Sequence, residues 1–195
     1  MSKIRLGVMG GTFDPIHNGH LVAASEAASA FGLDKVLFVP TGEPWQKQDI
    51  TASEHRLAMT TLAIAGNPLF EISSVDVQRA GPTYTVDTLR EIHESNPDAD
   101  VYFITGADSI AQIESWKDSS QIWPLAHFVG VTRPGHTLEV PKTASGNVSL
   151  LEIPALAISS TDIRARVKSG KPIEYLLPNS VIDYIHAHHL YQGTK

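Results

Sequence analysis

Two histidines, His17 and His20, end a glycine-rich stretch that begins at Gly10. The stretch follows an apolar run over residues 4–9, which we expect to be a buried strand, and precedes an expected helix over residues 19–31. A glycine-rich turn between a strand and a helix N-terminus is the geometry that binds phosphate, because unpaired backbone N–H groups point at the ligand. Two imidazoles leave most coordination positions of a metal ion empty. We therefore expect the histidines to donate hydrogen bonds to phosphate oxygens, and the glycines to let the backbone approach a ligand closely.

A second group of polar residues lies near the other end of the chain, at Ser159, Thr161 and Arg164. Ser-x-x-Asp before a helical run is a capping signal, so the group predicts a helix N-terminus with free amides, hydroxyls and an arginine one turn in. Such an end suits terminal phosphates. An ordinary helix cap explains this group taken alone, but its presence together with the glycine-rich stretch favours one nucleotide site formed by both.

Two loops carry residues that suit a second ligand. After the second expected strand, Lys47 supplies positive charge for a phosphate, and Trp45 is either a ligand contact or a surface anchor of the loop. Further on, Tyr84 and Thr85 lie at the start of an expected helix, where exposed amides suit a small carboxylate. A capped helix without a ligand is the alternative there.

Gly106-Ala107-Asp108 follows the fourth expected strand, and Trp116 lies eight residues after Asp108. A carboxylate at the carboxyl end of a strand faces a ligand in parallel sheets. A tryptophan stacks on a planar ring, which adds about 0.5–1.5 kcal/mol beyond burial. Core packing is the alternative for Trp116.

Alternating strands and helices position these residues. Strands are expected over residues 4–9, 35–39, 70–77, 101–105, 127–131 and 148–153, and helices over residues 19–31, 53–65, 85–95, 109–116, 119–125 and 180–190. Thr51-Ala52-Ser53-Glu54 is a capping-box pattern before the second helix. The alternation predicts an α/β fold, a Rossmann-like doubly wound parallel sheet with helices on both faces, which binds ligands beyond the carboxyl ends of its strands. We expect a single domain over residues 1–195, with an α/β core over about 1–155 and a small C-terminal helical part over about 156–195 that carries the second motif.

Composition narrows the classes of function. With 195 residues, 42% of them hydrophobic and 18% charged, the chain is long enough for a core of its own. It has no cysteine, which excludes disulfides, thiolate metal sites and cysteine nucleophiles. The formal charge of −6 argues against nucleic acid as the main partner. No signal peptide or membrane span is visible, so we expect a cytoplasmic protein.

The stretch from Gly10 to His20 resembles the signature of the nucleotidyltransferase superfamily related to class I aminoacyl-tRNA synthetases. Its form, Gly-Gly-Thr-Phe-Asp-Pro-Ile-His-x-Gly-His-Leu, is most similar to the bacterial nicotinate-nucleotide adenylyltransferase branch. Residues 159–164 are similar to the superfamily's Ser-x-Thr-x-Ile-Arg motif. The Thr-Tyr-Thr run and the Gly-Ala-Asp…Trp element point to the nicotinate branch, and the likeness continues to the closing Leu190-Tyr191. It departs at Pro44-Trp45-Gln46-Lys47, where family members often have Pro-Pro-His followed by Lys or Arg.

The resemblance implies transfer of AMP from ATP to nicotinate mononucleotide, giving nicotinic acid adenine dinucleotide and pyrophosphate in NAD biosynthesis, with Mg²⁺ as cofactor and no metal site made by the protein itself. It implies catalytic His17 and His20. It implies ATP binding by Gly10, Gly11, Thr12, Phe13, His17, Gly19, His20, Arg133, Ser159, Thr161 and Arg164. It implies acceptor binding by Trp45, Lys47, Tyr84, Thr85, Gly106, Asp108 and Trp116.

Three alternatives stay open. In the first, the acceptor is nicotinamide mononucleotide. In the second, it is another phosphorylated molecule, such as phosphopantetheine or, in cytidylyl transfer, glycerol phosphate. In the third, the protein is a nucleotide-binding sensor without turnover. The Thr-Tyr-Thr run, Asp108 and Trp116 argue against the phosphopantetheine and cytidylyl branches. No nucleic-acid or membrane partner is expected, and a homo-oligomer is left open.

Overall fold

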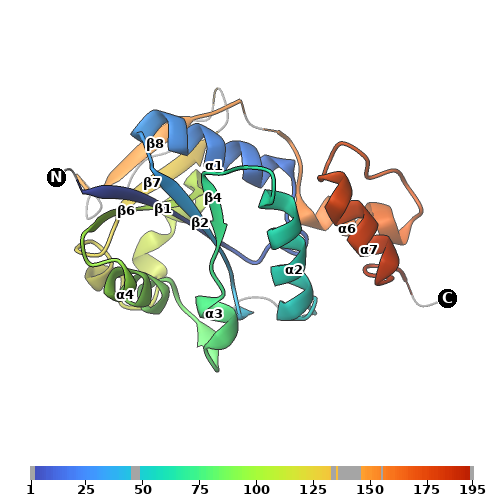
Figure 1. Ribbon diagram of the computed structural model, residues 1–195, viewed down its shortest axis with the longest axis horizontal. Coiled ribbons are helices and arrows are strands. Elements are labelled where there is room, and N and C mark those ends of the chain that lie inside the picture. Colours follow the sequence, from blue (N-terminus) through green and yellow to red (C-terminus); the bar gives the residue numbers. More distant parts are fainter. Residues whose placement is uncertain (1–2, 45–48, 133–134, 136–145, 155, 194–195) are drawn as a thin grey trace.

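Six parallel strands form one sheet in the order β4-β2-β1-β6-β7-β8 in the computed structural model, which describes residues 3–44, 49–132, 135, 146–154 and 156–193 (Figure 1). The strands are β1 (Ile4–Gly11), β2 (Lys35–Pro40), β4 (Phe70–Ile72), β6 (Ala99–Gly106), β7 (His127–Thr132) and β8 (Val148–Glu152). Every neighbouring pair is parallel. The expected Rossmann-like parallel sheet is confirmed.

Strand β1 lies at the centre and is buried from Leu6 to Met9. An apolar run covered on both faces is typical of parallel sheets. Val8 pairs with Leu37 of β2 on one side and with Phe103 of β6 on the other. The chain first builds outward through β2 and β4, and then returns to the opposite side of β1. The loops after β1 and β6 therefore diverge, and they leave the crevice in which such sheets bind ligands.

Helices cover both faces of the sheet, as expected. One face carries α1 (Asn18–Phe31), α2 (Ser53–Ile64), α6 (Ser160–Lys168) and α7 (Asn179–Ala187). The other carries α4 (Thr85–Ser95), α5 (Ala107–Ala111) and two 3₁₀ helices, η1 (Ile113–Ser115) and η2 (Ser119–Gln121). Figure 1 shows α6 and α7 together beside α2, and the three share one hydrophobic cluster with α1.

None of the described helices is long and apolar enough to cross a membrane. The cytoplasmic location expected from the sequence stays a prediction.

The third expected strand is too long. Strand β4 ends at Ile72, and the short helix α3 (Val75–Gln78) follows. The carboxylate of Asp76 accepts hydrogen bonds from Thr88 and Arg79. These tertiary contacts hold a turn of helix where the β-branched residues favour a strand.

Two expected helices are also shortened. The helix expected over 109–116 splits into α5 and η1, and the helix expected over 119–125 keeps only η2. Three isoleucines of these segments are fully buried, namely Ile110, Ile113 and Ile122. Short turns therefore bury the same side chains that a longer helix would.

The capping box expected before α2 is wrong. The N-cap residue of α2 is Ala52, which makes no side-chain cap. Instead, the Thr51 backbone N–H donates to Asp14 Oδ2 at 3.2 Å. The final helix ends earlier than expected, at Ala187, and Tyr191 beyond it has a positive φ of 61°.

A small two-stranded ladder was not predicted from the sequence. Strands β3 (Glu43–Pro44) and β5 (Pro82–Thr83) pair in parallel. Just before β3, a Cβ on Gly42 would lie 2.1 Å from the backbone oxygen of Asp76. Only glycine allows this approach, which joins the segment after β2 to α3.

Candidate active site

His20 presents a defined nitrogen. The backbone N–H of His17 donates to His20 Nδ1 at 3.2 Å, and the two rings stack with centroids 3.7 Å apart. Because Nδ1 accepts this bond, the ring proton lies on Nε2. The His20 ring therefore acts as a hydrogen-bond donor through Nε2 while it is neutral.

His17 is the buried member of the pair, with 6% of its surface exposed. Burial lowers its pKa from 6.5 to about 4, so the ring is neutral near pH 7. Its Nδ1 atom is buried and has no hydrogen-bond partner among the described residues. It lies at the first turn of α1, where the side chains of His17 and His20 are arranged as a capping box.

The second motif contacts the first, although the two lie about 150 residues apart in the sequence. Arg164 Nη1 donates to the backbone oxygen of Asp14 at 2.7 Å, and Ser160 Oγ donates to that of Pro15 at 2.8 Å. Ser159 caps α6, because its hydroxyl accepts from the Asp162 N–H at 3.1 Å. The start of α6 therefore lies against the loop that precedes α1.

A cavity of about 740 Å³, here called the central pocket, lies between the two motifs. Of the residues predicted to bind ATP, it is lined by Gly10, Gly11, Thr12, Phe13, His17, His20, Ser159, Thr161 and Arg164. The structure thus brings both predicted phosphate-binding motifs to one cavity.

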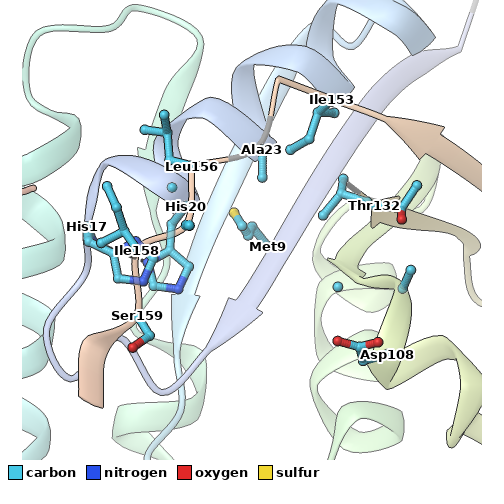
Figure 2. Close-up of a pocket in the computed structure, with 15 residues that line it drawn as sticks. Met9, His17, His20, Ala23, Asp108, Thr132, Ile153, Leu156, Ile158 and Ser159 are labelled. Atoms are coloured by element: carbon cyan, nitrogen blue, oxygen red, sulfur yellow. Dashed lines mark hydrogen bonds between the residues drawn. The ribbon is translucent and has the colours of Figure 1, made fainter. Parts of the chain in front are cut away.

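A second cavity, here called the Ala23 pocket, has a volume of about 510 Å³ and adjoins the histidines (Figure 2). Its apolar lining includes Met9, Ala23, Val131, Ile153, Leu156 and Ile158, and the predicted residues Gly19 and Gly106 also line it. Figure 2 shows the two imidazoles and Ser159 on one side, with Asp108 and Thr132 opposite.

Asp108 lies in a different place from the one expected. It lines the Ala23 pocket and not the pocket that holds Trp116 and Thr85. Successive residues of a helix point in different directions. On α5 the next residue, Ser109, lines the Trp116 side instead. Asp108 and Trp116 therefore line two different cavities.

A third cavity, here called the Trp116 pocket, has a volume of about 340 Å³. Its hydroxyl-rich lining includes Thr12, Thr41, Thr83, Thr85, Thr88, Thr105 and Ser109. The half-buried Trp116 packs edge-on against Phe103 with centroids 6.2 Å apart and also lines the cavity. The Trp116 ring therefore packs against the core and also lines the cavity. Tyr84 is not part of this lining; Lys117 Nζ lies 4.2 Å from its ring centre.

The glycines of the first motif also pack closely against aromatic rings within the protein. A Cβ on Gly11 would lie 2.7 Å from the Phe13 ring, and one on Gly10 would lie 3.2 Å from Phe103. Packing of these aromatic rings therefore restricts a side chain at both positions, most strongly at Gly11.

The comparisons with known proteins agree on one family. The cytidylyltransferase-like family matches residues 8–166. A protein of Leifsonia xyli subsp. xyli, named "probable nicotinate-nucleotide adenylyltransferase", is 62% identical over 193 residues, which are 99% of this chain and 96% of its own. A protein of Streptomyces coelicolor with the same name is 60% identical over 187 residues, which are 95% and 100% of the two chains. This chain belongs to the nicotinate-nucleotide adenylyltransferase family.

Solved structures of this family share the fold. The nicotinic acid mononucleotide adenylyltransferase of Plasmodium falciparum in complex with NaAD superimposes with a TM-score of 0.80 at 24% identity. The superposition covers 96% of this chain and 97% of the Plasmodium falciparum chain. A putative nicotinate-nucleotide adenylyltransferase from Vibrio parahaemolyticus gives a TM-score of 0.72 at 20% identity, over 98% and 97% of the two chains.

Three residues that the family resemblance assigned to ligands lie outside the described residues, namely Trp45, Lys47 and Arg133. Their predicted roles stay predictions. The segment that departs from the family pattern is thus largely outside the described chain.

Sequence reasoning missed the arginine that ties the site's loops together. Arg56 is fully buried and donates to three backbone oxygens, those of Thr12, Gly42 and Thr51, each at 2.8 Å. Burial lowers its pKa from the ordinary value, and the nearby charge of Asp14 opposes that shift. Arg56 sits inside an ordinary amphipathic helix, so its sequence context gave no signal.

Two polar residues of the Trp116 pocket were also missed. The Thr83 hydroxyl is buried without a hydrogen-bond partner among the described residues, and Thr83 is only 8% exposed. Asp76 is buried and accepts from Thr88 Oγ1 at 2.7 Å and from Arg79 at 2.9 Å. Burial raises the Asp76 pKa. The pocket therefore offers polar atoms beyond those of the family motif.

Proposed function

We propose that this protein transfers AMP from ATP to nicotinate mononucleotide, giving nicotinic acid adenine dinucleotide and pyrophosphate, a step of NAD biosynthesis. The observation that carries the proposal is the order of the three pockets. The central pocket shares His17, His20 and Ser159 with the Ala23 pocket, and it shares Thr12 and Thr105 with the Trp116 pocket. A nucleoside, its phosphates and an acceptor fit this order, and relatives at about 60% identity carry the name of this activity.

In this proposal the reaction is a direct in-line displacement. An oxygen of the acceptor's 5′-phosphate attacks the α-phosphorus of ATP, the bond from that phosphorus to the bridging oxygen breaks, and pyrophosphate leaves. The protein's share is placement and charge stabilisation, as in other phosphoryl transfers. His20 donates from Nε2 to the oxygens that gain charge, and Arg164 with the N-termini of α1 and α6 holds the phosphates.

The adenosine binds in the Ala23 pocket. Its apolar lining of Met9, Ile153 and Leu156 suits a flat base. The Asp108 carboxylate is an acceptor only, which suits the hydroxyls of a ribose. This assignment replaces the acceptor role expected from the sequence.

The acceptor's pyridine ring binds in the Trp116 pocket, where it stacks on Trp116. The carboxylate on the ring lies at the start of α4, which begins at Thr85. The first amides of a helix have no partner within the helix and favour an anion. An amide in place of the carboxylate lacks the charge, so the acid is the preferred substrate.

Magnesium enters with the triphosphate. Among the described residues no group of three or more His, Asp or Glu side chains would hold a metal ion. Mg²⁺ commonly keeps several waters and binds through substrate phosphates, where it neutralises their charge. Asp14 lines the central pocket, but both of its carboxylate oxygens already accept hydrogen bonds from Thr51 and Tyr191, so the phosphates and water would hold the metal.

Pyrophosphate release from the purified protein tests the proposal. ATP with nicotinate mononucleotide should release pyrophosphate, and excess EDTA should abolish release until Mg²⁺ is restored. Nicotinamide mononucleotide should be used far less well, and phosphopantetheine, or glycerol phosphate with CTP, not at all. A preference for the amide would overturn the assigned acceptor. Tight ATP binding without pyrophosphate release from any acceptor would favour a sensor.

A further inference from the structure

The last described segment of the chain reaches back to the first motif. Tyr191, 177 residues after Asp14, donates its hydroxyl proton to Asp14 Oδ1 at 2.7 Å. The tyrosine follows α7, and its ring packs on the cluster shared by α1, α2, α6 and α7. The mechanism proposed above gives no role to this contact.

Asp14 is a junction of three elements and is only 4% exposed. Its Oδ1 accepts from Tyr191, and its Oδ2 accepts from the Thr51 N–H at 3.2 Å, just before α2. Its backbone oxygen accepts from Arg164 Nη1 at 2.7 Å. Both oxygens of the side chain and the oxygen of the backbone are therefore committed to partners far away in sequence.

This junction bears on the phosphate site because Asp14 and Arg164 both line the central pocket. A guanidinium is planar, and its N–H groups point in fixed directions. Once Nη1 donates to Asp14 and Nη2 to Thr161 at 3.4 Å, the direction of the other N–H groups is set. The orientation of Arg164 thus depends on where the Asp14 backbone is held.

The hydroxyl of Tyr191 is a permanent donor. Burial and the charge of Asp14 raise its pKa above the ordinary value, so it keeps its proton at any working pH. A buried polar pair adds little net stability over an apolar pair of the same shape, because both partners lose their hydration. What such a pair does supply is a defined geometry.

We propose that Tyr191 is a positioning residue for nucleotidyl transfer: its hydroxyl anchors the Asp14 side chain, and Asp14 in turn orients Arg164 toward the phosphates. The inference rests on the proposed function. It makes docking of the C-terminal segment a condition of full activity, although no atom of that segment lines the three pockets.

The test is Tyr191→Phe, which removes one hydroxyl and keeps the ring. Tyr175→Phe is the matched control, because Tyr175 is 90% exposed and lines none of the three pockets. With ATP and nicotinate mononucleotide varied in turn, Tyr191→Phe should lower kcat about 10-fold, since a small misplacement of a phosphate-binding group costs that much or more. The KM for nicotinate mononucleotide should stay within about twofold, and the melting temperature should fall by only a few degrees.

A double-mutant cycle separates positioning from general stability. In an Arg164→Lys background there is no planar fork left to orient, so removal of the Tyr191 hydroxyl should cost less than about twofold. A merely structural hydroxyl would cost the same factor in both backgrounds. Equal losses in the two backgrounds, or wild-type kcat in Tyr191→Phe, would overturn the inference while wild-type turnover still supports the proposed function.

ATP affinity keeps the two proposals distinguishable. If the wild-type protein releases no pyrophosphate with nicotinate mononucleotide, the proposed function fails, and the inference is then judged by the Kd for ATP. Tyr191→Phe should raise this Kd about fivefold relative to wild type and Tyr175→Phe, because Arg164 holds the phosphates in the ground state as well. An unchanged Kd would overturn the inference in that case.

Discussion

The phosphate end and the acceptor end of the site are built in different ways. The phosphate end consists of two contiguous motifs, and two arginines bind backbone oxygens of the first motif: the buried Arg56 at Thr12 and the half-buried Arg164 at Asp14. The acceptor end, the Trp116 pocket, combines the start of the first motif with short segments after β2, at α3, at the start of α4 and after η1. The difference teaches that phosphate chemistry is encoded locally, whereas the shape around the acceptor depends on how separate turns meet.

The two histidines repeat this contrast on a smaller scale. His20 has its tautomer fixed by a backbone N–H three residues away, which is a local effect of the motif. His17 is held neutral by burial, which is an effect of packing around it. Variants that remove either effect tell local encoding apart from tertiary placement.

The largest expected effect is at the phosphate end. His20→Ala should lower kcat by about 100- to 1,000-fold, the usual loss when one donor to a developing negative charge is removed. His186→Ala, on an exposed position of α7, should leave kcat unchanged. Pyrophosphate release measures both, and circular dichroism checks the fold. Wild-type turnover in a folded His20→Ala would place the catalytic donor elsewhere.

The next effect is at the acceptor end. Gly42→Ala puts a Cβ 2.1 Å from the Asp76 backbone oxygen, so the loop or α3 must move. We expect a loss of about 1–3 kcal/mol in the free energy of unfolding, together with a higher KM for nicotinate mononucleotide. Gly66→Ala is the control, because no atom lies within 4 Å of the added Cβ. Urea denaturation and steady-state kinetics measure the two effects. Equal stability in both variants would mean that the contact is not a constraint.

The burial of His17 predicts a pH dependence of stability. Its pKa is about 4 in the folded protein against 6.5 as the ordinary value, so between these pH values the unfolded chain binds more protons. The contribution of neutral His17 to the free energy of unfolding is therefore fully present above pH 6.5 and is lost as the pH falls toward 4. From pH 7 to pH 5, urea denaturation should give the wild type an extra loss of about 2 kcal/mol relative to His17→Gln. Parallel curves for the two proteins would show that His17 is not held neutral.

The smallest effect tests the ring of Trp116. Trp116→Leu should raise the KM for nicotinate mononucleotide about 2- to 10-fold, equivalent to about 0.5–1.5 kcal/mol of aromatic stacking, and leave the KM for ATP unchanged. Trp123→Leu is the control, because Trp123 packs on Phe128 in the same cluster but lines none of the three pockets. A matched rise in both variants would mean that the effect comes from the core.

Much of the fold was predictable because it depends on short-range patterns. The central strand was visible as a short apolar run, and α4 was predicted with its bounds because its apolar residues recur at helical spacing. Where the prediction erred, as at α3 and in the capping box before α2, a distant side chain decided the outcome. Asp76 binds Thr88, and Asp14 takes the N–H of Thr51.

The sequence by itself determined the chemistry of this protein: a parallel α/β sheet, two phosphate-binding motifs, and the family to which they belong. Residue type and spacing suffice for these, because helix N-termini and their hydroxyls are local features. Only the tertiary structure decided that Asp108 faces the Ala23 pocket, that Arg56 joins three loops, and that Tyr191 reaches Asp14. The direction of a side chain across the sheet depends on contacts between residues far apart in the chain, and no short pattern records them.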